Sequence, residues 1–447
     1  MSAERSLEFA ETAVQRALHF GAEECEVFVT ESRNISAELQ KNDLHCTSTS
    51  VETSIGIRVF RKGSIGFVNI NSPDAIDAAC EEALVLAQAM PSDPLNGLRD
   101  PEAIDPLPLS PDRGLESMTV EDVVALAHDL VQHVTGKDDR VMIDSGDVSV
   151  GIGVRAIATS RGHRASETAA VAGGSLFGMA VDGKDVGSFD YDGQYVTNRE
   201  SLQSELRSAA DRFLIKTLGA LGAQPGETFR GPIILTPEVV ADFVIGNLVA
   251  VLSGKSVRLG KSPFKDRLNQ RVISPLITIW DDPRHPGGIG SQSFDREGYP
   301  TRLLPLFDEG HLRTFLFDTY EGRSFGAKPT GSARGGASSI PAIGPTNLAM
   351  EPGDQSFSRL CTDPERAVVV SRFSGNCSPI TGEFSGVVKG GFLMRHGERI
   401  PIKETLIAGN LYEALNRVSG ISAESRLLNG RLRAPAIRLE DISITAG

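Results

Sequence analysis

The chain has 447 residues, which is long for one hydrophobic core and suits two or three domains. Apolar residues make up 40% of it and charged residues 23%, a composition that excludes a largely disordered chain. The formal net charge is −13, since 58 acidic residues outnumber 45 basic ones, and this charge disfavours non-specific binding to nucleic acid or to an anionic membrane.

The sequence gives little indication of a signal peptide, a membrane span or paired cysteines. The first residues lack the basic and apolar segments of a secretory signal peptide. The longest apolar stretch, residues 239–252, is short for a bilayer span and contains Asp242 and Asn247. The five cysteines are odd in number, and none forms a Cys-x-x-Cys pair. We therefore expect a cytoplasmic protein without a disulfide framework or a zinc knuckle.

The first unit is predicted over residues 1–95 as an α+β domain. Apolar residues at helical spacing predict a helix over 7–18, and Pro73 opens a second helix with a small-residue apolar face. Lys62-Gly63 forms the turn of a hairpin between them. The predicted strands are residues 25–30, 35–39, 54–60 and 64–70.

A proline-rich linker is predicted over residues 96–117, since six prolines lie between 91 and 117. A middle α+β domain follows at 118–222. Its predicted elements are a helix over 120–134, strands over 148–159, 167–177 and 179–191, and a helix over 201–218. Both units run helix, antiparallel strands, helix, which is explained equally well by an internal duplication or by coincidence between two α+β layers.

The third domain is predicted over residues 228–447 and is rich in strands. A buried strand ends near Thr236, the expected N-cap of a helix over 237–252. Hairpin turns are expected at Asp308–Gly310 and at His396-Gly397. Further predicted elements are strands over 303–307, 312–318 and 436–445 and a helix over 410–418. The predicted fold class is therefore α+β, with two helix-plus-antiparallel-sheet units followed by a strand-rich C-terminal domain.

Nucleotide and nucleophile motifs are incomplete. Gly254-Lys255-Ser256 lacks the earlier glycine of a phosphate-binding loop, because that position holds Val249. No sequence feature supplies a base for Cys377. These patterns favour structural roles.

The histidine and acidic clusters are better explained by structure than by metal binding. His128 and His133 lie five residues apart and diverge on a helix. The other candidates flank turns, where aspartate is common without any metal. They are Asp281, Asp282 and His285 in one cluster and Asp308 and His311 in another.

Several short segments, in a fixed order along nearly the whole chain, resemble the TldD/PmbA family of peptidases, also described as modulators of DNA gyrase. Each is weak alone, and their number and order make the resemblance specific. They are Gly56–Val59, Gly63–Phe67, Asp295–Arg302, Leu306–Leu312, Thr330–Arg334, Pro345–Leu348, Glu351–Gly353, Ile380–Ser385, Lys389–Phe392 and Ile407–Leu411.

The resemblance implies a cytosolic system of two proteins that acts on peptides and unfolded chains. One subunit type carries zinc through a helical His-Glu-x-x-x-His motif and a cysteine near the C-terminus, and the PmbA-like or TldE-like type lacks them. At the corresponding helix this chain has Pro237, Glu238 and Asp242, so that both histidines are replaced, and no cysteine follows Cys377. The resemblance therefore predicts no catalytic and no metal-binding residue here, and no cofactor in this chain, with zinc in a TldD-like partner.

The predicted function is that of a non-catalytic, TldE-like subunit of a metalloprotease complex that processes peptides. Its expected partners are a TldD-like zinc subunit in a heterodimer, or a second copy in a homodimer, and an extended peptide, without nucleic acid or membrane. Candidate contacts to peptide or partner are Thr381, Gly382, Glu383, Phe384 and Ser385, and a structural hairpin turn is the alternative. The alternatives for the whole chain are a stand-alone peptidase with an unrecognised site and a peptide-binding or regulatory protein.

Overall fold

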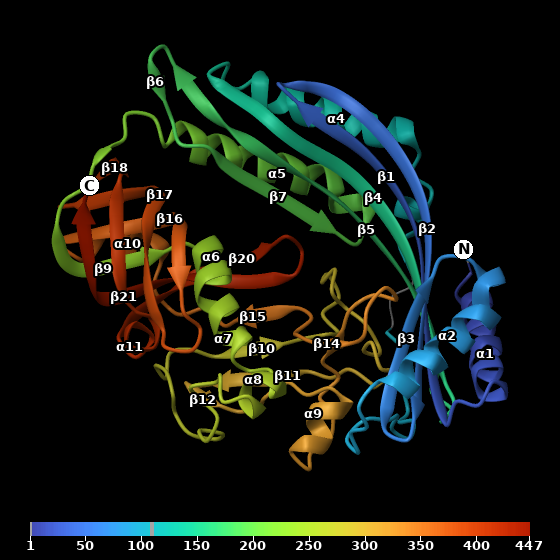
Figure 1. The fold of residues 1–447 in the computed structure, drawn as a ribbon. Helices are drawn as coiled ribbons and strands as arrows, with labels where there is room; N and C mark the ends of the chain where they lie inside the picture. Colours follow the sequence, from blue (N-terminus) through green and yellow to red (C-terminus); the bar gives the residue numbers. More distant parts are fainter. Residues whose placement is uncertain (1, 108–110) are drawn as a thin grey trace.

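A computed structural model describes residues 2–107 and 111–447. Two regions make up the fold: a curved antiparallel sheet covered by helices, formed by the N-terminal half, and a strand-rich C-terminal region on the concave side of that sheet (Figure 1). The predicted α+β class is confirmed. Among the described residues, no helix combines the length and the apolar composition that a bilayer span needs.

The first sheet is antiparallel at every pairing, in the order β3-β2-β1-β4-β5-β6, with β7 also paired to β5. Its strands are β1 (Glu24–Gln40), β2 (Asp43–Arg61), β3 (Ser64–Ile70), β4 (Val141–Thr159), β5 (Arg164–Asp182), β6 (Asp185–Val186) and β7 (Asp190–Val196).

Alternation along β1 assigns the two faces of this sheet. Its odd-numbered apolar residues, from Val27 to Leu39, pack against the helices. Phe28 points the other way and packs against Phe294 of the C-terminal region. The helices on the first face are α1 (Ala3–His19), α2 (Ile76–Ala89, after the short η1, Pro73–Ala75), α4 (Val120–Thr135) and α5 (Arg199–Leu218).

The two N-terminal units share one sheet, and their strands are arranged symmetrically. Each unit runs helix, three main strands, helix, and the strand order is mirrored about the central β1 and β4 pair. A duplication would produce this order. The domain boundaries remain predictions, because the two units are joined along the length of β1.

The segment between the units packs against the C-terminal region. Leu98 is buried, whereas Leu115 in α3 (Arg113–Glu116), near the end of the segment, packs into the core of the middle unit. The Arg323 guanidinium donates to the carbonyls of Leu95 at 2.9 Å and Gly97 at 3.0 Å. Part of the predicted linker, residues 108–110, lies outside the described residues.

The C-terminal region is built on a 12-stranded sheet in which β21 and β9 are central neighbours. Most pairings are antiparallel, as the turn signals predict, and three are parallel: β15 with β21, β16 with β9, and β18 with β8. The strands are β8 (Gln224–Pro225), β9 (Phe229–Leu235), β10 (Ile279–Asp281), β11 (Leu304–Asp308), β12 (His311–Leu312), β15 (Leu348–Met350), β16 (Arg366–Cys377), β17 (Glu383–Arg395), β18 (Glu398–Lys403), β19 (Thr405–Asn410), β20 (Val418–Leu428) and β21 (Leu432–Ala446).

Short helices fill the connections of this region, and a separate pair of strands lies apart from the large sheet. The pair is β13 (Ala333–Arg334) and β14 (Ala342–Ile343). The helical segments are α6 (Pro237–Val239), η2 (Val240–Ile245), α7 (Gly246–Ala250), α8 (Gly254–Arg258), α9 (Thr319–Ser324), α10 (Phe357–Thr362) and α11 (Leu411–Leu415).

A buried ion cluster joins the two regions. The Glu26 carboxylate on β1 accepts from Arg58 at 2.6 Å and from Arg296 of the C-terminal region at 2.7 Å. Arg58 also pairs with Glu297 at 3.0 Å. We call these four residues the joint cluster. Since the Glu26 side chain is fully buried, the cluster fixes how the C-terminal region meets the sheet.

Candidate functional site

The segment after β9 forms the first wall of the candidate site. A single helix is predicted over residues 237–252, and the structure divides it into α6, the π-helical η2 and α7. Thr236 precedes the first turn as predicted, but its hydroxyl makes no cap bond. π-helical turns are rare and are often found at functional sites, so this interruption draws attention to the residues it presents.

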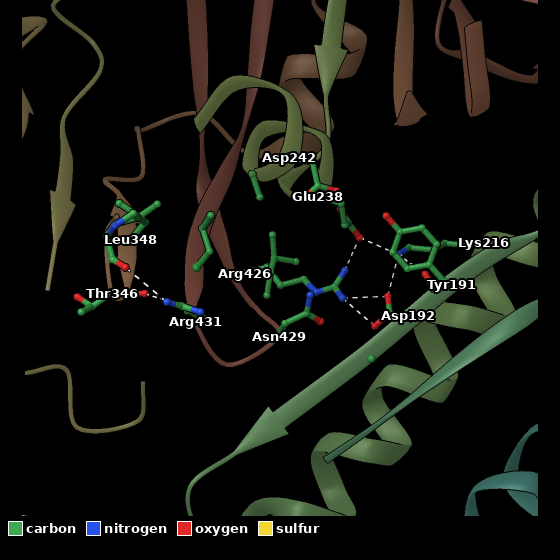
Figure 2. A pocket seen from close by; sticks show the side chains of 15 residues that line it. Tyr191, Asp192, Lys216, Glu238, Asp242, Thr346, Leu348, Arg426, Asn429 and Arg431 are labelled. Carbon is green, nitrogen blue, oxygen red and sulfur yellow. Dashed lines mark hydrogen bonds and ion pairs between the residues drawn. The ribbon is translucent and has the colours of Figure 1, made fainter. Parts of the chain in front are cut away.

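A cavity of about 310 Å³ opens beside this segment, where it faces β7, the end of α5 and the β20–β21 hairpin (Figure 2). A second cavity of about 400 Å³ shares Tyr191, Glu238 and Asp242 with the first and continues along β16. The hairpin approaches β7 closely at Gly430, which has a φ of +65°. A Cβ atom at Gly430 would lie 2.4 Å from the Tyr195 carbonyl, so only glycine permits this contact.

Two carboxylates in the first cavity are each shared by several cations. The fully buried Asp192 pairs with Lys216 and Arg426, both at 2.8 Å, and with Arg212 at 3.0 Å. Glu238 pairs with Lys216 at 2.9 Å and with Arg426. We call Asp192, Lys216, Glu238 and Arg426 the cavity cluster. Figure 2 shows Arg426 bridging the two carboxylates.

The electrostatics of this cluster keep Glu238 ionised. Burial alone would raise the pKa of Glu238, but the charges of Lys216 and Arg426 outweigh it and lower the pKa to about 2. The same pairing raises the pKa of Lys216 despite its burial. Asp242 is different, because burial and the Glu238 charge both raise its pKa.

Comparison of the sequence with known protein families gives two matches. Residues 228–446 match the model of the PmbA/TldA metallopeptidase C-terminal domain, and residues 25–87 match the model of the PmbA/TldA metallopeptidase domain 1. The chain belongs to the PmbA/TldD family of metallopeptidases.

Relatives of this PmbA/TldD member align over almost its whole length. The metalloprotease PmbA of Escherichia coli O157:H7 is 26% identical over 96% of this chain and 95% of that protein. A metalloprotease of Methanothermobacter thermautotrophicus is 24% identical, over 89% of this chain and 87% of its own length. The crystal structure of TldE from Thermococcus kodakarensis has the same fold, with a TM-score of 0.89 and 24% identity over 98% of this chain and 100% of that one.

A PmbA/TldD metallopeptidase implies a metal, but the residues of this chain do not fit zinc at the helix concerned. Pro237 offers no side-chain ligand, and Glu238 Oε1 is already paired with both Lys216 and Arg426. Zinc sites in proteins take about three or four His, Cys or carboxylate ligands. Over residues 2–107 and 111–447, no group of three or more such side chains is arranged to hold a metal ion.

The residues of the two acidic clusters singled out in the sequence bond to other groups of the protein. Asp281 accepts from the Thr346 backbone at 2.8 Å, and Asp282 accepts from the Arg284 backbone at 3.0 Å. Asp308 pairs with Arg313 at 3.0 Å. His285 accepts from the Gly287 backbone at 3.2 Å, and His311 contacts the Glu309 carbonyl at 3.2 Å. Asp282, His285, Asp308 and His311 thus bond within their own turns, whereas Asp281 ends β10 and ties that strand to the Thr346 loop.

The predicted contact residues Thr381, Gly382, Glu383, Phe384 and Ser385 lie at the β16–β17 hairpin and line neither cavity. Phe384 is buried in the core, while Thr381, Glu383 and Ser385 are exposed. Gly382, with a φ of +79°, donates to the Ser378 carbonyl at 2.7 Å. The hairpin is thus a well-bonded turn with three polar side chains facing solvent, and its role in contacts stays a prediction.

Sequence reasoning identifies Glu238 and Asp242 but misses Asp192, Lys216 and Arg426. These three come from β7, α5 and β20, so no local pattern connects them. One signal exists for Asp192. It lies in β7, a strand that packs on a helix, and an aspartate buried in such a strand needs a cation beside it.

Proposed function

We propose that this chain is a subunit without its own catalytic zinc, which pairs with a TldD-like, zinc-bearing subunit and helps to hold an extended peptide. One observation carries the proposal: at the helix where the family places His-Glu-x-x-x-His, the remaining glutamate, Glu238, is held by Lys216 and Arg426. In this proposal the chain forms one wall of the peptide-binding site and supplies groups that bind the peptide, and the partner supplies the zinc that hydrolyses it.

The chemistry of the cavity supports this division of labour. Zinc-dependent hydrolysis needs about three protein ligands and an open position for water. Here Lys216 and Arg426 pair with both carboxylates, and Arg212 also pairs with Asp192, so a dication would have to displace these cations. In this proposal Glu238 has no role as a general base, because that role would need a metal-bound water beside it and the helix offers no histidine ligands for the metal.

The free edge of β7 supports binding of an extended peptide. In the described part of the chain β7 pairs with β5 alone, and Tyr191, Asp192 and Gly193 on β7 line the cavity. A peptide that adds to a sheet edge binds through its backbone, with little dependence on sequence. This mode suits a subunit of a peptidase that acts on unfolded chains.

The partner is the second part of the proposal. A heterodimer in the cytoplasm with a TldD-like subunit is favoured over a homodimer, because the chain supplies no zinc ligands of its own. The exposed side chains of the β16–β17 hairpin, Thr381, Glu383 and Ser385, are the candidate contacts to that partner.

Mixing the two proteins tests the proposal. An unstructured peptide is incubated with this chain, with the TldD-like partner, with both, and with both plus a chelator, and metal is measured in each purified chain. We expect cleavage only in the mixture without chelator, co-purification of the two chains, and stoichiometric zinc only in the partner. Cleavage by this chain alone, or one tightly held zinc per chain, would favour the stand-alone peptidase instead.

A further inference from the structure

The first cavity has a third cation, Arg431, whose surroundings differ from those of the cavity cluster. Arg426 and Lys216 are each held by two carboxylates. Arg431 forms no ion pair within the described residues, and its side chain bonds to the carbonyls of Thr346 at 2.6 Å and Pro345 at 3.4 Å. Carbonyls orient a guanidinium but leave its charge uncompensated.

The position of Arg431 is built into the fold. It follows the tight turn of the β20–β21 hairpin, where Asn429 and Gly430 have positive φ and the Arg431 amide donates to the Leu428 carbonyl at 3.0 Å. The loop that orients it is fixed in turn, since Asp281 accepts from the Thr346 backbone at 2.8 Å. The guanidinium is therefore held in one place before any ligand arrives.

An apolar wall separates the two charged ends of the cavity. Leu348, Leu428 and Leu432 line it together with Ala241 and Pro345. Figure 2 shows the cavity cluster on one side and Arg431 with Thr346 on the opposite side. A ligand that fills this space meets an unpaired cation at one end and apolar side chains along its path.

We propose that this cavity binds the C-terminal carboxylate of a peptide through Arg431, with the last side chain of the peptide packed against Leu348, Leu428 and Leu432. The proposal rests on the proposed function, since it takes for granted that peptides reach this subunit. A guanidinium presents paired N–H groups that match a carboxylate, and the apolar wall favours a terminal residue such as leucine. The subunit thereby recognises where a peptide chain ends.

Binding of defined peptides to the full chain alone tests this. Titration calorimetry compares an unstructured hexapeptide ending in leucine as the free acid with the same peptide as its C-terminal amide. We expect the free acid to bind roughly tenfold more tightly or better, because a charge-assisted bond is lost in the amide. A third peptide ending in aspartate should bind more weakly than the leucine acid, because its side chain meets the apolar wall.

Variants assign the effect to one side chain. Arg431→Gln should abolish the preference for the acid over the amide, and Arg431→Lys should keep part of it. The matched control is Arg433→Gln, two residues further along in β21, whose guanidinium contacts Ser425 at 3.4 Å and does not line the cavity, and the preference should persist there.

The outcomes separate this inference from the function above. Equal affinities for acid and amide, no binding of either, or a preference that survives Arg431→Gln would overturn the carboxylate site. In each case, co-purification and cleavage in the mixed sample still decide the subunit role independently. If Arg431→Gln does not fold, the comparison of acid and amide on the unaltered chain is decisive by itself.

Discussion

Two buried ion clusters of this protein have similar chemistry and different surroundings. The joint cluster pairs Glu26 with Arg58 and Arg296, and its side chains are between 0% and 8% exposed. In the cavity cluster Asp192 is fully buried, whereas Lys216, Glu238 and Arg426 are 16% to 21% exposed and border open space.

The difference separates an ion cluster that fixes geometry from one that also presents groups to a ligand. In the joint cluster, every side chain pairs with another member of the cluster, and the pairs connect β1, β2 and the C-terminal region. In the cavity cluster, the charges are balanced within the protein, and the neighbouring Arg431 supplies the uncompensated one.

Removing one charge from the joint cluster is expected to have the largest effect. Glu26→Gln leaves Arg58 and Arg296 buried without their shared carboxylate, and we expect a loss of about 3–5 kcal/mol in the free energy of unfolding. Urea unfolding measures it. The matched control, Glu11→Gln, breaks an exposed pair with Arg164 and should cost about 0–1 kcal/mol. Equal losses of unfolding free energy in both variants would contradict a special role for the joint cluster.

The corresponding change in the cavity cluster should cost less. After Glu238→Gln, Asp192 still pairs with both Lys216 and Arg426, so we expect a loss of about 1–3 kcal/mol. Peptide cleavage by the mixture with the partner should be largely retained. If the variant still bound its partner but cleavage disappeared, the non-catalytic assignment would be wrong.

The pH dependence of stability distinguishes the same two proteins, the natural chain and Glu238→Gln. The pKa of Glu238 lies near 2 rather than 4.5, since two cations stabilise its charged form. A carboxylate with a lowered pKa stabilises the fold above its unfolded pKa and loses that effect as the pH falls towards its folded pKa. We therefore expect the difference in unfolding free energy to be constant above about pH 5 and to shrink as the pH falls towards about 2. A difference that grows with acidity would refute the pairing.

The smallest effect on stability is expected at the β16–β17 hairpin. A double variant, Thr381→Ala with Ser385→Ala, changes exposed side chains and should alter the free energy of unfolding by less than about 0.5 kcal/mol. Its informative readout is capture of the TldD-like partner, which should weaken. Unchanged capture would remove this hairpin from the list of contacts.

The sequence predicts elements well where local pattern and packing agree. The hairpin strand β3 has the predicted bounds, and α4 and α5 agree with theirs within two residues. It predicts poorly where tertiary pairing overrides composition. Residues 31–34 of β1 are polar and suggest a break, yet they pair with β2 on one side and β4 on the other, so one strand continues through them.

A second difference concerns residues 179–191, predicted as one strand. The structure ends β5 at Asp182, turns at Gly183 with a φ of +60° and starts β7 at Asp190. Of the strand predicted over 312–318, only Leu312 lies in β12, and Asp318 at its far end caps α9 by accepting from the Glu321 amide at 2.8 Å. The site follows the same rule: Glu238 is visible from a motif, whereas its partners from distant elements become visible only after folding.

The C-terminal region begins and ends at one point of its surface. The Ala446 backbone donates to the Thr228 hydroxyl at 3.0 Å. Thr228 directly precedes β9, Ala446 ends β21, and these two strands are paired neighbours. A segment whose two ends touch can be joined to another chain at that point, or inserted into one, without crossing its own sheet. Residues 228–446 therefore have the connectivity of a portable module, and an excised or circularly permuted version would carry Glu238, Arg426 and Arg431 without the Asp192 and Lys216 that the curved-sheet half contributes to the cavity.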